Sequence, residues 1–226
     1  MTPPSTTQAT DAAAAPRLTV SLRETRVLAE RNLLLLGVPK GAVPAVRDLV
    51  VEAEALGLGG LAFLDAARDL PGWRPPALDE ASSPVVVEAH GVPAPYVAPA
   101  LLDLGMALLR ERGGARIEVR DVAVPHLLLA LPYAAQPYGG AVTVTLGTGA
   151  PRIEVAERHG PPACPHIERT VHEGLEVEAS LWWRLYHRST GALTEDTPLS
   201  RRHAGATLDP DAADPDTDLD YLAVTL

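Results

Sequence analysis

The sequence has 226 residues, of which 46% are hydrophobic and 21% charged, and a formal net charge of −10. A chain of this length and apolar content can bury a sizeable core, which excludes disorder throughout. The negative charge excludes a general affinity for nucleic acid, because nonspecific binding needs clustered Lys and Arg side chains that release counterions from phosphates. We therefore expect no nucleic acid among the partners.

The sequence predicts neither a membrane segment nor a secretory signal. The longest apolar runs, 33–36 and 127–131, are far shorter than the roughly 20 residues that a bilayer requires. Residues 1–16 lack the positive region and apolar core of a secretory signal, so we expect a disordered leader there. The single cysteine, Cys164, cannot form an internal disulfide and agrees with a reducing compartment. A cytoplasmic protein is expected.

The first third of the chain is predicted to be helical. Ser21 followed by Glu24 is a capping-box pattern, and the apolar periodicity that starts there continues to Gly37, a typical stop. Pro44 suits the first turn of a second helix. The three helices expected in this region span 21–37, 44–57 and 59–70.

Strand and helix patterns alternate irregularly in the rest of the chain. Consecutive β-branched valines, Val85–Val87, indicate a buried strand, and the turn at 147–149 between two alternating segments indicates an antiparallel hairpin. A last helix should start at the N-cap Ser180 and end at Gly191. The other expected elements are strands at 84–89, 116–122, 141–146, 152–156 and 175–179, a helix at 97–112, and a short or kinked helix within 125–135.

The predicted fold class is α/β (α+β): one mixed sheet with helices on at least one face. The stretch 71–84 holds four prolines and is expected to be a loop or hinge at a lobe boundary. The expected parts are a disordered leader, 1–16; a mixed α/β domain, 17–208, with possible helical and sheet-containing lobes at 21–70 and 84–208; and an acidic tail, 209–226.

Two charged clusters lie near the C-terminus. Ser200, Arg201 and Arg202 could bind a carboxylate, sulfate or phosphate, or could pair with the acidic tail. The closely spaced aspartates of this tail repel one another and its prolines block regular pairing, so residues from about Asp209 to Asp218 are expected to pack little and remain mobile. It lacks the central glycine and terminal glutamate of a calcium loop, and calcium is not expected there.

No motif indicates a cofactor. The glycine clusters have neither the spacing nor the context of a dinucleotide-binding or P-loop fingerprint, and no serine lies in a nucleophile elbow. Nothing near Cys164 in the sequence lowers its pKa. Together with His159, His166 and His172 it could supply zinc ligands, but the spacing matches no zinc module, and surface histidines are the favoured interpretation. We expect no cofactor and no metal.

Three residues are candidates for proton transfer or covalent chemistry. Lys40 is the one lysine among 19 basic residues, and an ammonium can lose its proton whereas a guanidinium effectively cannot. His90 ends a predicted buried strand, where functional groups collect in α/β sheets, and His126 lies in the apolar segment 125–132. The alternatives, a solvated surface charge for Lys40 and structural hydrogen bonding for each histidine, are favoured for each residue taken alone.

Three segments together resemble an uncharacterised bacterial family, a domain of unknown function of about this length. They are Val20-Ser21-Leu22-x-Glu24 with Leu36-Gly37-Val38-Pro39-x-Gly41; Val122-Ala123-Val124-Pro125-x-Leu127-Leu128-Leu129 with Pro132-Tyr133; and Thr197-Pro198-x-Ser200-Arg201 before Ala204-Gly205-Ala206. This resemblance spans nearly the whole chain and implies no catalytic residues.

A second resemblance rests on length, probable origin and the lack of a standard motif. The heavy use of arginine, alanine and proline fits a GC-rich coding sequence, such as an actinobacterial one. In these respects the chain resembles aziridine-forming subunits of azinomycin-type antibiotic biosynthesis, in which a leaving group is displaced within an amino-acid-derived intermediate.

Two functional hypotheses follow. The first is a cofactor-independent lyase or cyclase subunit that eliminates an anionic leaving group, such as sulfate during aziridine formation. Lys40, His126 or His90 would transfer the proton, and the Ser200–Arg202 cluster would bind the anion. The second is a noncatalytic partner- or ligand-binding protein in a heteromeric complex. The first gains if Lys40, His90, His126 and Arg201 line one pocket, and the second gains if they scatter over the surface.

Adjacent tryptophans predict association with another chain. Neighbouring helix positions point about 100° apart, so Trp182 and Trp183 cannot both face one narrow core stripe. Trp182 groups with Leu185 and Ser189, whereas Trp183 groups with Tyr186. Tryptophan is enriched among interface hot spots, so we expect a dimer or heteromeric complex with one ring in the contact. The alternative is a wide interior that holds both rings.

Overall fold

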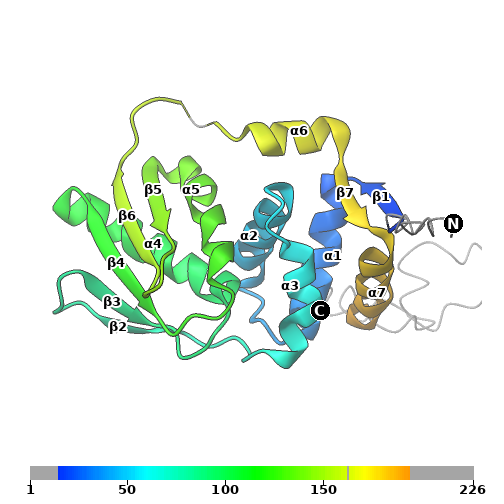
Figure 1. Ribbon diagram of the computed structural model, residues 1–226, viewed down its shortest axis with the longest axis horizontal. Helices are drawn as coiled ribbons and strands as arrows, with labels where there is room; N and C mark the ends of the chain where they lie inside the picture. The colour runs from blue at the N-terminus through cyan, green and yellow to red at the C-terminus, as the bar shows by residue number, and fades with distance from the viewer. Residues whose placement is uncertain (1–14, 162, 194–226) are drawn as a thin grey trace, which may run out of the picture. The chain divides into compact units, whose positions relative to one another are not determined.

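The computed structural model describes residues 15–161 and 163–193 (Figure 1). The chain divides into a compact unit, Met1–Ala192, and a second unit, Leu193–Leu226. All the elements described below belong to the first unit. The aspartates of the predicted acidic tail lie outside the described residues.

Seven α-helices, seven strands and four short 3-10 helices make up the described chain. In order they are β1 (Arg17–Val20), α1 (Leu22–Leu35), α2 (Val43–Ala55), α3 (Gly60–Ala66), η1 (Ala67–Asp69), β2 (Ala77–Asp79), β3 (Val85–Glu88), α4 (Ala94–Arg112), β4 (Ala115–Arg120), η2 (Pro125–Ala130), α5 (Leu131–Ala134), η3 (Gln136–Tyr138), β5 (Gly140–Thr145), β6 (Arg152–Glu157), α6 (Pro165–Glu173), β7 (Leu175–Glu178), α7 (Ala179–Ser189) and η4 (Thr190–Ala192).

The five-stranded sheet is mixed, which confirms the predicted fold class. Its strand order is β2-β3-β4-β6-β5, and β3 and β4 are parallel while the other neighbours are antiparallel. β5 and β6 form the expected late hairpin. A separate antiparallel pair joins β1 to β7, so a strand at the start of the described chain pairs with one close to its end.

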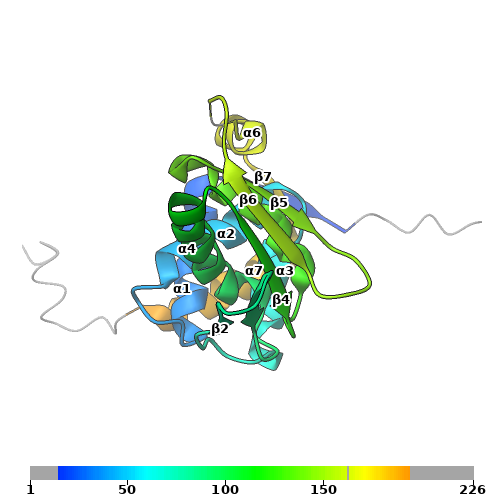
Figure 2. The same cartoon turned by 90° about the vertical axis from the view of Figure 1, so that its left-hand side faces the viewer.

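Helices cover one face of the sheet, and the other face is polar. Along β4, Ile117 and Val119 are buried under α4, while Arg116 and Arg120 are exposed on the opposite face. Figure 2 shows α4 lying against the strands. The approach is close at Gly105, where an added Cβ would lie 2.9 Å from a methyl of Val155.

The helical layer continues the same core beyond the sheet. The predicted capping box of α1 is present, because the Ser21 hydroxyl accepts from the Glu24 amide and the Glu24 carboxylate accepts from the Ser21 amide. α2 packs between α1, α3 and α4. At the α2–α3 contact, an added Cβ on Gly60 would lie 2.0 Å from the Val50 carbonyl oxygen, so only glycine fits there.

The chain returns to the helical layer after the hairpin. α6 runs from the sheet side towards β7, and α7 then packs on α1 and α3 (Figure 1). β1, the short strand β2 within the expected loop 71–84, and α6 were not predicted. The predicted N-cap role of Ser180 is wrong: the N-cap is Glu178, two residues earlier, and the Ser180 hydroxyl donates to the Glu178 carboxylate.

In the described part of the chain, no helix combines the length and apolar character needed to cross a membrane. α4, the longest helix, carries charged residues in its last turn and rests on the sheet.

Candidate functional site

A cavity of about 270 Å³ lies between α2, α4, α5 and α6. Its wall is mostly apolar and includes side chains from each of these helices. The apolar residues that line it include Leu49, Val51, Leu102, Leu131 and Ile167, and the polar or ionisable ones are Arg26, Asp48, Glu52, Tyr133, Tyr138 and Cys164. Such a wall, with a few polar groups among apolar ones, is typical of small-molecule sites.

Gln136 holds the segment that brings α6 over this cavity. Its side-chain amide donates to the Ala163 carbonyl at 2.9 Å, and its amide oxygen accepts from the Ala163 backbone amide. The Gln136 carbonyl in turn accepts from the Arg158 guanidinium at 3.2 Å. These contacts fix the backbone just before Cys164, which precedes the first residue of α6.

A buried Glu–His pair joins α2 to α6 at the cavity wall. The Nε2 atom of His166 is in hydrogen-bond contact with the Oε1 atom of Glu52, and their side chains are 7% and 13% exposed. The ring of Tyr133 meets the imidazole edge-on, with ring centroids 4.4 Å apart. The imidazole is thus held between a carboxylate and an aromatic ring.

Burial dominates the electrostatics of Glu52. Loss of solvent raises the pKa of this carboxyl, and the contact with His166 and the charge of Arg26 offset only part of that rise. His166 contacts Oε1 alone, and among the described residues Oε2 has no hydrogen-bond partner. One carboxylate oxygen is therefore available to a ligand in the cavity.

The electrostatic surroundings of Cys164 are negative. Burial raises the pKa of this thiol, and the negative charges of Glu52 and Glu168 raise it further. The thiol therefore stays protonated at neutral pH, which disfavours a nucleophilic role. The same charges would attract a cation to this part of the cavity.

At the cavity mouth, the charged groups offset one another. Asp48 accepts from Arg47 at 2.9 Å and lies 3.9 Å from Arg26. These side chains keep contact with solvent, whereas Glu52 lies deeper. The deeper carboxylate therefore dominates the field that a ligand inside the cavity would meet.

Lys40, His90 and His126 are all exposed, and none of them lines this cavity. Lys40 lies in the turn between α1 and α2. His90 and His126 follow the parallel strands β3 and β4, so the structure brings their segments to one sheet edge, where the Gly91 amide donates to the Asp121 carbonyl at 2.6 Å. Ser200, Arg201 and Arg202 lie outside the described residues.

The expectation that the late histidines lie at the surface is wrong for His166, which is buried against Glu52. Within the described residues, no group of three or more His, Cys, Asp or Glu side chains is placed to hold a metal ion. Sequence reasoning missed the Glu52–His166 pair because its members lie far apart in the chain. The available signal was Glu52 itself, a carboxylate inside the apolar run 49–53.

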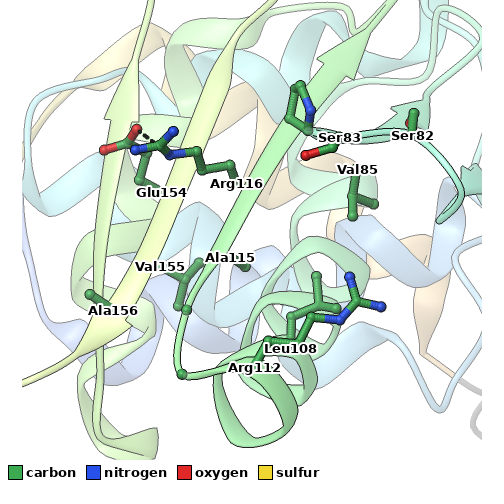
Figure 3. Close-up of a pocket in the computed structure, with 13 residues that line it drawn as sticks. Ser82, Ser83, Val85, Leu108, Arg112, Ala115, Arg116, Glu154, Val155 and Ala156 are labelled. Carbon is green, nitrogen blue, oxygen red and sulfur yellow. Dashed lines mark ion pairs between the residues drawn. The ribbon is translucent and has the colours of Figure 1, made fainter.

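A second hollow lies at one end of the sheet (Figure 3). It measures about 510 Å³ and is lined by residues of β4, β6 and the end of α4, among them Arg112. Its ion pair, Arg116–Glu154 at 3.4 Å, is 80% and 61% exposed. Charges so open to water are strongly screened. The smaller cavity beside Glu52 is the better candidate site.

The chain matches no family model and no curated protein. The resemblance to an uncharacterised bacterial family, drawn from three short segments, therefore stays a prediction.

Among solved structures, the malate dehydrogenase of Entamoeba histolytica is similar over 76% of this chain, with 12% identity and a TM-score of 0.47. A dehydrogenase of Sinorhizobium meliloti (67%, 18% identity, TM-score 0.46) and the malate dehydrogenase of Pyrococcus horikoshii (75%, 11%, 0.46) are similar to the same degree. The chain spans 62%, 50% and 60% of the lengths of these three proteins. Likeness at this level transfers no activity to this chain.

Proposed function

We propose that this protein is a noncatalytic ligand-binding protein whose cavity takes a small organic cation with an apolar body. The observation that carries the proposal is the position of Glu52, a nearly buried carboxylate in an apolar cavity wall. A heteromeric complex, expected from the sequence, remains part of the proposal.

None of Lys40, His90 and His126 lines the cavity, and Lys40 lies in the α1–α2 turn while the other two follow the parallel strands β3 and β4, which supports binding rather than catalysis by those residues in this cavity. A buried carboxylate is costly unless a cation or hydrogen-bond donors compensate its charge. His166 contacts one oxygen, and the other is not among the buried unpaired atoms of the described residues, so it stays open to the cavity, where an ammonium ligand would contact it. The cavity of about 270 Å³ lies at the small end of ligand sites, so the ligand should be small.

Tyrosine rings favour the same class of ligand. Tyr133 and Tyr138 both line the cavity, and aromatic faces attract cations through their quadrupole. The apolar side chains of Leu102 and Leu131 would receive the hydrocarbon part. An aliphatic or aromatic primary amine combines these features.

The test compares three probes of nearly the same shape by calorimetry: benzylamine, benzyl alcohol and benzoate. We expect benzylamine to bind about tenfold or more tightly than the alcohol, since a hydrogen bond to a charged group contributes roughly 1.5–3 kcal/mol. Benzoate should bind weakest. If none of the three binds, the cavity is not a ligand site; if all bind alike, selection by charge is wrong.

Two variants on α2 assign the effect to Glu52. Glu52→Gln keeps an acceptor for His166 but removes the charge, so it should abolish the preference for the amine. Glu54→Gln is the matched control, because Glu54 is also buried on α2 but accepts from the Leu61 amide at 2.8 Å and does not line the cavity. Equal loss in both variants would indicate a change in the helix rather than in the site.

The lyase or cyclase hypothesis remains as a second candidate, favoured by the raised pKa of Glu52. A desolvated carboxylate is a fitting proton acceptor, and an amino-acid-derived substrate carries an ammonium group. In aziridine formation the amine nitrogen would attack the carbon bearing sulfate, a C–N bond would form, and sulfate would leave with the C–O electron pair. Glu52 would accept the amine proton, and Arg26 would face the departing anion.

Sulfate release from an O-sulfonated amino alcohol, measured by ion chromatography, tests this second candidate. Turnover that is lost in Glu52→Gln and kept in Glu54→Gln would favour catalysis. Tight binding of the substrate without sulfate release would favour the noncatalytic function.

A further inference from the structure

A third hollow, of about 540 Å³, lies between α1 and α7, away from the cavity beside Glu52. Its lining includes Val27, Trp182, Trp183 and Tyr186, flanked by Arg23 and Arg31. We call this surface the α1–α7 groove. α1 and α7 lie side by side along it (Figure 1).

The two tryptophans divide as the helix geometry predicts. Trp182 is 7% exposed and packs in the core with Leu185, whereas Trp183 and Tyr186 are 47% and 45% exposed. The exposed rings meet edge-on, with centroids 5.5 Å apart, and the His187 ring lies over Trp183 at 6.1 Å. The groove thus presents an ordered aromatic surface rather than scattered apolar atoms.

The charge around the groove is positive, in contrast to the net charge of the chain. α7 has no acidic residue between Ala179 and Ser189. The acidic residue in the lining, Glu24, is held by the Ser21 cap. Within the described residues, neither Arg23 nor Arg31 forms an ion pair. The ion pairs between α1 and α2 are formed by Arg26 with Asp48 and by Arg47 with Glu30.

This charge distribution indicates which kind of partner the α1–α7 groove favours. A second copy of the chain, docked groove to groove, would set Arg23 and Arg31 against the same arginines and bring only the carboxylate of Glu24, which the Ser21 cap already holds. An amphipathic helix with acidic residues beside its apolar face would place those carboxylates against Arg23 and Arg31. We propose that the α1–α7 groove docks an acidic amphipathic helix of a partner protein, with Trp183 and Tyr186 as the apolar anchors.

The docking follows a known physical scheme. An amphipathic helix presents side chains at i, i+3, i+4 and i+7 to a hydrophobic groove, and aromatic residues supply most of the binding energy. Acidic residues on the incoming helix would steer its approach and raise the association rate at low salt. Affinity should therefore fall as ionic strength rises.

The experiment uses the full chain and two labelled peptides that share a leucine face and differ in their polar face, one glutamate-rich and one lysine-rich. Fluorescence anisotropy should show binding of the glutamate peptide at least about tenfold tighter than binding of the lysine peptide. Trp183→Ala and Tyr186→Ala should each weaken the glutamate peptide about tenfold or more. Leu78→Ala, an exposed apolar residue on β2, is the control and should change nothing.

Three results would overturn the proposal. The first is that the lysine peptide binds as tightly as the glutamate peptide. The second is that Trp183→Ala binds the glutamate peptide as tightly as the parent chain does. The third is that Arg31→Glu leaves the affinity for the glutamate peptide unchanged. Light scattering tests whether a second copy of the chain occupies the groove instead. A parent chain that is dimeric, with a Trp183→Ala variant that is monomeric, would assign the groove to a second copy and would also overturn the proposal.

Discussion

The helical layer and the open face of the sheet carry the same types of charged side chain in different surroundings. On the sheet, Arg116 and Glu154 form an ion pair that is mostly exposed. In the helical layer, Arg188 donates to the Asn32 side chain and to the Leu64 carbonyl, and its side chain is mostly buried. Water screens the Arg116–Glu154 ion pair, whereas it barely reaches the hydrogen bonds of Arg188.

Burial, rather than the number of charges, decides where electrostatics matter in the molecule. The cavity beside Glu52 and the hollow at the end of the sheet both contain ionisable groups, but the ion pair of the sheet hollow is largely exposed to water. Burial lowers the pKa of Arg188 and raises the pKa of Glu54. Each buried charge therefore depends on its partners, and removing a partner has a large effect.

The largest expected effect is that of Arg188→Ala. This change leaves the Asn32 side-chain oxygen and the Leu64 carbonyl without their donor and removes the 4.0 Å ion pair with Asp65, so we expect a loss of about 3 kcal/mol in the free energy of unfolding. Urea denaturation followed by circular dichroism measures it. Arg184→Ala is the matched control on α7, since Arg184 donates to the same Asp65 at 2.9 Å but is exposed.

The control should cost less than about 1 kcal/mol. Equal losses in the two variants would mean that the shared partner Asp65, and not burial, determines the contribution. That result would remove the distinction between the helical layer and the sheet.

A smaller effect is expected from Glu54→Gln, through the pH dependence of stability. Because burial raises the pKa of Glu54 above its ordinary value of 4.5, the folded state holds this proton more tightly than the unfolded state does. The stability linked to that proton is complete below the ordinary pKa and is lost as pH rises through the folded-state pKa. Glutamine does not titrate, so the variant should gain stability relative to the parent over that pH range.

Thermal unfolding from pH 4 upward, with Glu154→Gln as the exposed control, measures this gain. Glu54 is chosen because it accepts from the Leu61 amide and contacts no histidine, whereas Glu52 titrates beside His166. A stability difference that shrinks with rising pH in Glu54→Gln would contradict the assigned direction.

Local signals account for the parts of the fold that could be predicted. The capping box of α1 and the hairpin of β5 and β6 depend on residues near one another in sequence. β1 was missed because its partner β7 lies at the other end of the described chain. α6 was missed because it is a short helix after prolines, and its burial comes from contact with α2.

The site was harder to predict for the same reason. Lys40 stands out as the single lysine, and His90 and His126 stand out by their position at a strand end and in an apolar segment, but the structure exposes all three. Glu52 and His166 are ordinary residues on two helices, and their chemistry arises from a contact that the sequence does not display. The exposure of one of the two adjacent tryptophans was predictable because helix periodicity separates their directions, and the structure shows that the exposed one is Trp183.

The smallest effect is expected on the open face of the sheet. Arg116→Ala, Glu154→Ala and the double variant form a mutant cycle across the β4–β6 pair, where the two residues lie directly opposite. Because both side chains are largely in water, we expect a coupling free energy below about 0.5 kcal/mol that declines further in high salt. Urea denaturation of the four chains at low and high ionic strength measures it. A coupling as large as the loss in Arg188→Ala would show that the sheet face is less solvated than its exposure indicates, and that a partner or ligand covers it in solution.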